Sequence, residues 1–312
     1  MVVAAGVRIG WPDLPGEVRA AVRAILGAPV VEATSQAGGF SPGTADRVRT
    51  ADGRRAFVKA VSPAQNEDSP RMHRREARIT AALPPDVPAP ELLGVHDDGD
   101  WVALVLEDID GRHPVTPWLP DEMAGVLATL DRMAGTLTPS PIDDVASVAE
   151  HLAGDFAGWC RIVAEPPSDL DPWVAGRLES LVDLADRGLE ALHGDTLVHL
   201  DVRADNLLLG PDGRVTLVDW PWASRGPAWL DRLLLLVNAR LYGAVDTHDM
   251  LLRCAADTSA DPDDLVAALV GLAGFFLDAS RQPPPKSIPT VRAFQRAQAD
   301  AVLAWLRPVL AS

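Results

Sequence analysis

The 312-residue sequence contains very little lysine and cysteine. Its two cysteines, Cys160 and Cys254, provide neither a disulfide framework nor a cluster of thiol metal ligands, and both fit a reducing cytoplasm. Lys59 and Lys286 are the only lysines among 28 Lys and Arg residues, so arginine occupies nearly every other cationic position. A lysine retained in such a chain is therefore a candidate for a specific role.

Long apolar runs are also absent. The longest, residues 233–237 and 265–277, are too short or too interrupted for a membrane span. The N-terminus lacks the basic segment and apolar stretch of a secretory signal, and no internal repeat is present. A hydrophobic content of 47% with 23% charged residues is typical of globular chains. We therefore expect a cytoplasmic protein without a membrane partner.

The charge balance is strongly acidic, at −16. A net charge of this sign disfavours nucleic acid as a partner. Residues 1–110 hold 12 basic and 16 acidic residues, a balance of −4, and residues 111–312 hold 16 and 28, a balance of −12. Most of the acidity therefore belongs to the last two thirds of the chain.

The hydrophobic pattern divides the chain into a β-rich part and a helical part. Four β-prone runs and two helical segments precede residue 110, which favours a small α+β unit. These are the strands 47–50, 56–61, 92–96 and 101–106 and the helices 16–26 and 69–83. Helical periodicity then predicts the segments 121–137, 143–163, 172–193, 229–240, 246–256, 261–279 and 290–310. Only a hairpin within residues 207–218 is expected to interrupt them.

Residues 197–220 combine a polar loop with this hairpin. Asp201 and Asn206 lie in the polar part, and two apolar runs joined by a Pro-Asp-Gly turn form the predicted ribbon at 207–218. Asp219 follows directly. The hairpin returns the chain to its starting point, so we expect both carboxylates and the amide at one end of the ribbon. Phosphoryl transfer needs such a set, a carboxylate to orient a hydroxyl and oxygen ligands for Mg²⁺.

This segment resembles the catalytic segment of the protein-kinase-like superfamily, and within it the aminoglycoside phosphotransferase-like small-molecule kinases. The loop pattern H-x-D-x-x-x-x-N is matched from His199 through Asp201 to Asn206, and Asp219 stands at the later metal position. Leu200 replaces the glycine usual in antibiotic kinases, and Asp-Trp-Pro replaces their D-x-D or D-x-E. These departures weaken the case for an aminoglycoside substrate. The alternative is a polar turn whose carboxylates cap backbone groups.

The resemblance implies a two-lobed α+β fold, with a nucleotide-binding lobe at 1–110 and a helical catalytic and substrate lobe at 111–312. Asp201 would orient and deprotonate the acceptor hydroxyl, and Asn206 and Asp219 would bind Mg²⁺. A P-loop signature is absent, which argues against a P-loop kinase.

Lys59 lies in the β-prone run 56–61, an unusual place for a charge without a partner. In the family that this chain resembles, a lysine on a strand pairs with a glutamate on a helix and binds the α- and β-phosphates. Glu76 would be that glutamate here. A compact ammonium suits such a point contact. The alternative is a strand-end lysine that snorkels and a solvated glutamate.

Two further segments are assigned to the nucleotide. The loop of Gly38, Gly39, Phe40 and Ser41 lets the backbone close over phosphates, although a plain β-turn is an equal alternative. The acidic stretch after the strand 101–106, from Glu107 to Ile109, corresponds to the crossing between lobes, where backbone groups meet the adenine edge in the family.

Five residues near the loop have open roles. Arg203 could neutralise charge in the transition state or form a salt bridge to Asp205. Trp220 and Trp222, with Trp229, could form a wall for a sugar or a cation, or pack the loop against helices. Asp231 could touch substrate, brace the loop as in related phosphotransferases, or complement a helix dipole.

We therefore predict a small-molecule phosphotransferase, monomeric or homodimeric, that uses ATP or GTP with Mg²⁺. The acidity of residues 111–312 favours a hydroxylated cation as acceptor, such as an amino sugar, an aminoglycoside or a basic antibiotic. The alternatives are a kinase of a neutral sugar or metabolite and a nucleotide-binding pseudokinase. A protein kinase is disfavoured, because no Ala-Pro-Glu segment follows Asp219.

Overall fold

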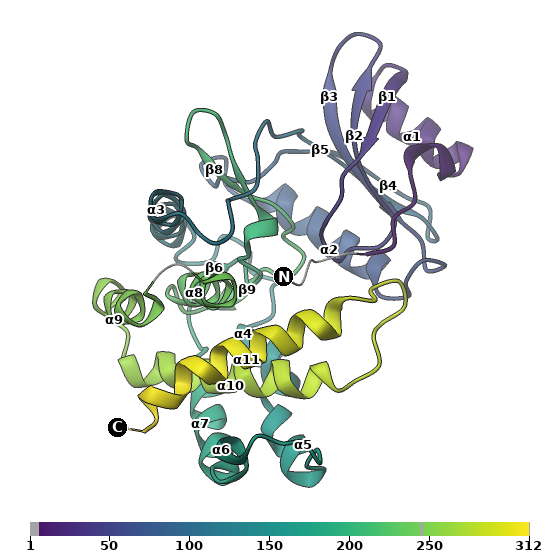
Figure 1. Ribbon diagram of the computed structural model, residues 1–312. Coiled ribbons are helices and arrows are strands. Elements are labelled where there is room, and N and C mark those ends of the chain that lie inside the picture. The colour runs from purple at the N-terminus through teal and green to yellow at the C-terminus, as the bar shows by residue number, and fades with distance from the viewer. Residues whose placement is uncertain (1–5, 244–245, 312) are drawn as a thin grey trace.

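An antiparallel five-stranded sheet and a larger set of helices form two lobes in the computed structural model, which describes residues 6–243 and 246–311 (Figure 1). The sheet has the order β1-β2-β3-β5-β4. Its strands are β1 (Val30–Ser35), β2 (Thr44–Thr50), β3 (Arg55–Val61), β4 (Leu92–Asp97) and β5 (Val102–Leu106). The two-lobed α+β architecture predicted from the sequence is confirmed.

Alternation along the strands gives the sheet two apolar faces, because successive side chains point to opposite sides. On β3, Val58 and Ala60 join a cluster with α1 (Gly16–Leu26), whereas Phe57 packs on the other side, near α2 (Ser69–Ala82). Both helices match their predicted segments. β1 was not predicted, because most of its residues are exposed at the edge of the sheet and show no buried alternation.

Helices build most of the second lobe. They are α3 (Pro120–Thr136), α4 (Val148–Phe156), α5 (Gly158–Ala164), α6 (Pro172–Ala175), α7 (Leu178–Glu190), α8 (Leu230–Tyr242), α9 (Thr247–Thr258), α10 (Pro262–Ser280) and α11 (Val291–Val309). α10 packs against α5, α7 and α11, and its residues Ala267 to Ala273 are almost fully buried. Among the described helices, none combines the length and apolarity that a bilayer span requires.

Two of the predicted helices are divided in the structure. The segment 143–163 breaks into α4 and α5 at Ala157, next to Gly158. A Cβ on Gly158 would lie 2.5 Å from the carbonyl oxygen of Gly274, so the close approach of α5 to α10 excludes a side chain there. The segment 172–193 breaks at Gly176 and Arg177 between α6 and α7.

Short strands frame the loop that carries the polar residues. The hairpin of β7 (Leu207–Leu209) and β8 (Val215–Leu217) is confirmed. The expectation that it alone interrupts the helical lobe is wrong, because β6 (Thr196–Val198) pairs with β9 (Ser224–Gly226). Each of these strands has three residues, too few to show a period, and the pairing is long-range.

The loop between α10 and α11 reaches across to the sheet lobe (Figure 1). The N–H of Val7 donates to the carbonyl of Ser287 at 2.9 Å. Asn66 donates to the carbonyl of Lys286 at 3.0 Å, and the ammonium of Lys286 donates to the carbonyl of Ala64 at 2.7 Å. These contacts join the two lobes at a place distant from the chain crossing at residues 107–111.

Candidate active site

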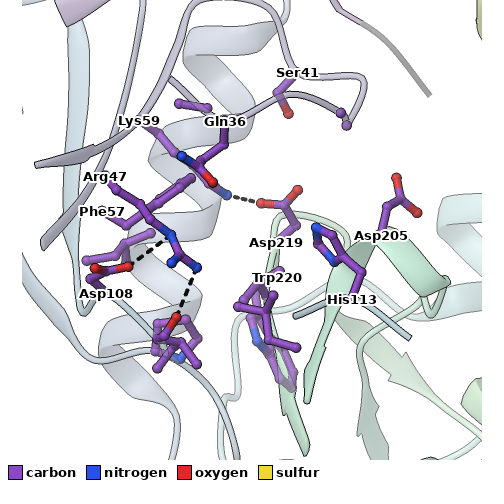
Figure 2. Close-up of a pocket in the computed structure, with 18 of the residues that line it drawn as sticks. Gln36, Ser41, Arg47, Phe57, Lys59, Asp108, His113, Asp205, Asp219 and Trp220 are labelled. Atoms are coloured by element: carbon purple, nitrogen blue, oxygen red, sulfur yellow. Dashed lines mark hydrogen bonds and ion pairs between the residues drawn. The ribbon is translucent and has the colours of Figure 1, made fainter. Parts of the chain in front are cut away.

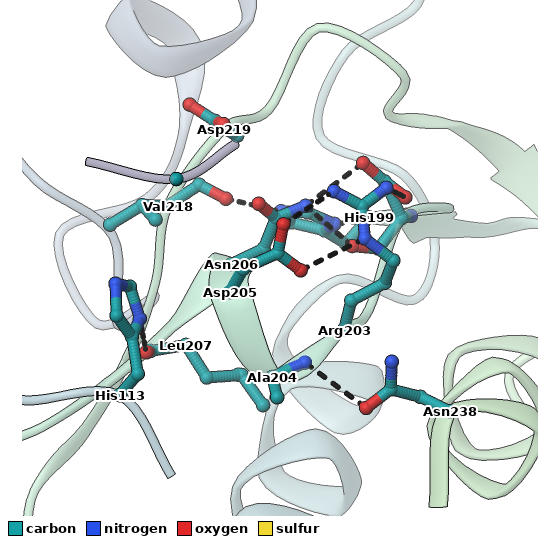
Figure 3. A network of polar contacts seen from close by, with 12 residues as sticks. His113, His199, Arg203, Ala204, Asp205, Asn206, Leu207, Val218, Asp219 and Asn238 are labelled. Atoms are coloured by element: carbon teal, nitrogen blue, oxygen red, sulfur yellow. Dashed lines mark hydrogen bonds and ion pairs between the residues drawn. The ribbon is translucent and has the colours of Figure 1, made fainter. Parts of the chain in front are cut away.

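The polar loop predicted to be catalytic lies between β6 and β7 and is held from two sides (Figure 3). His199 is buried, and burial lowers its pKa to about 4. Its Nδ1 accepts the N–H of Asp201 at 3.2 Å, so Nε2 carries the proton and donates to the carbonyl of Val218 at 2.9 Å. A neutral histidine therefore links the start of the loop to the end of the hairpin.

Helix α8 braces the same loop with two side chains. Both carboxylate oxygens of Asp231 accept backbone N–H groups, from His199 at 2.8 Å and Leu200 at 2.9 Å. Seven residues along α8, the side-chain oxygen of Asn238 accepts the N–H of Ala204 at 3.2 Å. Asp231 is 7% exposed and fully occupied by these bonds. It braces the loop, and the assignment to substrate contact is corrected.

Asp201 has both carboxylate oxygens engaged. Arg203 donates to Oδ1 at 2.6 Å, and the amide nitrogen of Asn206 donates to Oδ2 at 2.9 Å. Burial raises the pKa of Asp201 to about 7, and Arg203 opposes that rise. A general base works best when its pKa lies near the working pH. Arg203 also pairs with Asp205 at 2.9 Å, so the salt bridge considered from the sequence is present.

The hairpin returns the chain from Asn206 to the residue before Asp219, because the N–H of Val218 donates to the carbonyl of Asn206 at 2.9 Å. The amide nitrogen of Asn206 faces Asp201, which leaves its side-chain oxygen as a ligand. Two such oxygens suit Mg²⁺, which binds one or two protein oxygens and completes its shell with phosphate and water. The donor set at this place therefore fits the metal.

Lys59 joins the two lobes at the centre of the site (Figure 2). Its ammonium donates to Oε1 of Glu76 at 2.6 Å and also to Asp219. Its side chain is 9% exposed. Burial opposes the charge of Lys59, but Asp219 and Glu76 prevail and raise its pKa. The snorkelling alternative is therefore wrong for Lys59.

A cavity of about 370 Å³ opens between the lobes over these groups. Phe57 of β3 and Leu208 of β7 line it from the two lobes, and Gly38, Gly39 and Ser41 line its loop side (Figure 2). Phe40 does not line it. Its ring packs edge-on against Phe294 of α11, with centroids 5.2 Å apart, and the guanidinium of Arg203 lies 5.3 Å from its centroid.

Residues 107–109 line the far end of the cavity. The N–H of Glu107 is taken by the carbonyl of Glu91 at 2.9 Å, and the carbonyl of Ile109 accepts from Arg47 at 3.1 Å (Figure 2). Within the described part of the chain, neither the carbonyl of Glu107 nor the N–H of Ile109 has a hydrogen-bond partner. An acceptor and a donor two residues apart are thus open to a ligand.

The three tryptophans do not form one wall. Trp220 is 1% exposed, packs against the ring of His199 at 4.7 Å and donates to the carbonyl of Leu217 at 2.9 Å. Trp229 belongs to the helical core. Trp222 is 40% exposed and lies beside His151, with ring centroids 5.3 Å apart. The packing alternative therefore holds for Trp229, whereas Trp220 packs in the loop and also lines the cavity.

Among the cavity-lining residues that sequence reasoning missed are Phe57, Arg47 and Arg8. Phe57 could have been found, because it stands two residues before Lys59 on one strand and so shares its face. Arg47 is opposite Phe57 in the register of β2 and β3. Arg8 belongs to no motif, and only the fold brings it to the cavity.

The sequence profile of the phosphotransferase enzyme family matches residues 37–263. The chain belongs to this family. Membership makes it an ATP-dependent phosphotransferase of small molecules, as the resemblance implied, and the pseudokinase alternative is set aside. No curated protein matches the sequence.

Solved structures of this phosphotransferase fold are similar over nearly the whole chain. An aminoglycoside phosphotransferase from Alicyclobacillus acidocaldarius has 20% identity and a TM-score of 0.52, covering 92% of this chain and 95% of its own. The choline kinase LicA from Streptococcus pneumoniae has 11% identity and a TM-score of 0.60, covering 92% and 98%. A choline/ethanolamine kinase family protein from Mesorhizobium loti has 16% identity and a TM-score of 0.60, covering 93% and 94%. These similarities show the shared fold.

Proposed function

We propose that this phosphotransferase moves the γ-phosphate of ATP to a hydroxyl group of a small cationic acceptor. The observation that carries the proposal is that Lys59 and Asp219 are bonded to each other and line one cavity, while the bonded pair of Asp201 and Asn206 is joined to the residue before Asp219 by the bond from Val218 N–H to the carbonyl of Asn206. Positioning and electrostatic stabilisation provide most of the catalysis in phosphoryl transfer. The chain's residues would provide both.

In the proposed mechanism, Asp201 accepts the proton of the acceptor hydroxyl as that oxygen attacks the γ-phosphate, and ADP leaves with the electron pair of the broken bond between the γ-phosphorus and the bridging oxygen. Arg203 and Asn206 hold the Asp201 carboxylate in place. Mg²⁺, when bound by Asn206 and Asp219, would neutralise phosphate charge. Lys59, held by Glu76, would contact the phosphates in place of its present bond to Asp219.

We propose adenine rather than guanine as the base, stacked between Phe57 and Leu208. The open carbonyl of Glu107 can accept a hydrogen bond and the open N–H of Ile109 can donate one. Adenine presents an amino donor beside a ring-nitrogen acceptor, whereas guanine presents the reverse order. Comparing the affinities for ATP and GTP tests this assignment, and equal affinities would contradict it.

The cationic acceptor is supported by the balance of −12 beyond residue 110. An acidic cleft raises the local concentration of a cation, more so at low salt. The similar structures include an aminoglycoside phosphotransferase with hygromycin B and a choline kinase, and choline combines a hydroxyl with a quaternary ammonium.

A neutral sugar or metabolite is the second candidate, and the surroundings of exposed Trp222 favour it. Burial, together with Arg75 and Arg71, lowers the pKa of the neighbouring His151 to about 4. The two arginines that act electrostatically on His151 would repel a cationic acceptor beside it. The −12 balance would then serve solubility on exposed helix faces.

A screen of hydroxylated amines and neutral sugars with labelled ATP tests both candidates, with Asp201→Asn as the inactive control. For the best acceptor, kcat/KM is measured across a salt series. A cationic acceptor should lose kcat/KM as salt rises. A neutral acceptor whose kcat/KM ignores salt would refute the cationic proposal and leave the phosphotransferase assignment intact.

A further inference from the structure

The segment at residues 6–9, before the part of the chain matched by the family profile, lies along the glycine loop of the nucleotide cavity. The N–H of Gly6 donates to the carbonyl of Gly39 at 2.9 Å, and the N–H of Ile9 donates to the carbonyl of Gly43 at 3.2 Å. Gly6 has no room for a side chain, because a Cβ there would lie 2.7 Å from the carbonyl oxygen of Phe40. The fit between this segment and the loop is close.

Arg8 extends from this segment to the cavity and lines it. Its guanidinium donates to the carbonyl of Gly38 at 2.7 Å and to the carbonyl of Ser41. A guanidinium has five N–H donors, so three remain. One of them, on the buried Nε, has no hydrogen-bond partner in the protein. A buried donor without a partner is unfavourable unless a ligand supplies the acceptor.

Arg8 also differs in charge pairing from the other cations of the cavity. Lys59 is paired with Glu76 and Asp219, and Arg47 is paired with Asp108. Among the cavity-lining Lys and Arg residues in the described part of the chain, Arg8 alone has no carboxylate oxygen within 4.0 Å. Asp219 still acts on it electrostatically. The positive charge of Arg8 is therefore available beside the presumed metal ligand.

We infer that Arg8 is a second phosphate-binding cation, which donates its free N–H groups to the terminal phosphates of the nucleotide. Its bonds to the two loop carbonyls hold the guanidinium at the glycine loop, so it meets the phosphates already positioned. Planar, paired N–H donors suit phosphate oxygens. This inference rests on the proposed use of ATP, and it adds a residue from outside the family match.

Nucleotides with different numbers of phosphates distinguish this role from simple support of the loop. Equilibrium binding of ATP, ADP and adenosine to the full chain is measured for the wild type, Arg8→Gln and Arg8→Lys. Arg8→Gln should lower the affinity for ATP at least 10-fold, lower the affinity for ADP less, and leave the affinity for adenosine within 2-fold of the wild type. Arg8→Lys should recover part of the ATP affinity. Arg54→Gln removes an exposed arginine that pairs with Asp52 and should leave all three affinities unchanged.

An equal loss of affinity for all three ligands would show that Arg8 only shapes the loop, and unchanged ATP affinity would show that it makes no phosphate contact. Either result overturns the inference. The measurement needs no acceptor. A wild-type chain that binds ATP but phosphorylates none of the screened acceptors would therefore leave the Arg8 result standing and count against the proposed acceptors. A wild-type chain that binds neither ATP nor ADP would overturn both.

Discussion

Asp231 holds Leu200 in a left-handed backbone conformation. Leu200 has a φ of 66°, a left-handed value that residues other than glycine and asparagine rarely adopt. Its N–H donates to Oδ1 of Asp231 at 2.9 Å. The second oxygen of Asp231 holds His199. Leu200 also packs on the helical core. A brace from α8 and an apolar contact thus stabilise a conformation that glycine would adopt freely.

Removing the brace should destabilise the fold. Asp231→Ala leaves two backbone N–H groups without an acceptor, and each unsatisfied buried donor costs about 1–3 kcal/mol. Asp121→Ala is the matched control, because Asp121 is an exposed acid in the first turn of α3. Losing only its helix-dipole interaction costs about 0.3–1 kcal/mol. Denaturant unfolding measures the free energy of unfolding of both variants. Equal losses of stability would mean that Asp231 acts only as a charge at the helix end.

Asp201→Asn should lower kcat by about 10²–10⁴-fold, because the amide cannot accept the proton of the acceptor hydroxyl. ATP affinity should change little, since the proposed adenine site is lined by Phe57 and Leu208 and does not include Asp201. Turnover and ATP binding are measured on the same preparation. Near-normal turnover would remove Asp201 from the mechanism.

The activity should depend on the ionisation of Asp201. Its pKa is raised to about 7 by burial, and the proposed base must be unprotonated, so kcat/KM should rise with pH through about 7. Arg203 lowers this pKa, so Arg203→Gln should move the rise to higher pH. The titration of ATP itself is common to both enzymes, and the difference between the two profiles therefore reports Asp201. Coinciding profiles would contradict the assignment.

Lys59→Arg should impair ATP use although it keeps the charge. A guanidinium is longer and planar, and the space between Glu76 and Asp219 holds an ammonium. Lys286→Arg is the control, because its exposed ammonium donates only to the carbonyl of Ala64, which an arginine can also reach. The kcat/KM for ATP is compared for both variants. Equal values would mean that Lys59 has no special role.

Asp219→Ala should abolish the part of the ATP affinity that depends on Mg²⁺. ATP titrations with and without Mg²⁺ measure this, and thermal unfolding measures stability alongside. If Asp219 served only as a backbone cap, the variant would lose about 1 kcal/mol of stability and keep its Mg²⁺-dependent affinity. Asp219→Ala also removes one of the two partners of Lys59. Adding Lys59→Met to the Asp219→Ala variant shows how much of any stability loss comes from the ion pair between Lys59 and Asp219.

Local patterns were sufficient for elements whose signals lie in neighbouring residues. The first helix was predicted at 16–26 and is found at Gly16–Leu26, and the hairpin follows from its Pro-Asp-Gly turn. The local pattern did not predict features that depend on contacts between residues distant in the sequence. The break at Gly158 depends on the backbone of Gly274, and β6 forms only because β9 lies beside it.

The same division separates the residues of the site. The sequence by itself indicated the phosphotransferase family, because the order of Asp201, Asn206 and Asp219 around a turn resembles the catalytic segment of that family, and the family match confirms it. Only the tertiary structure decided that Asp231 braces the loop, that Trp220 packs against His199, and that the ring of Phe40 packs against Phe294 outside the cavity lining. Spacing along the chain limits which near neighbours can meet. Which distant groups share a cavity depends on the packing of whole elements, and that packing carried Arg8 to the glycine loop.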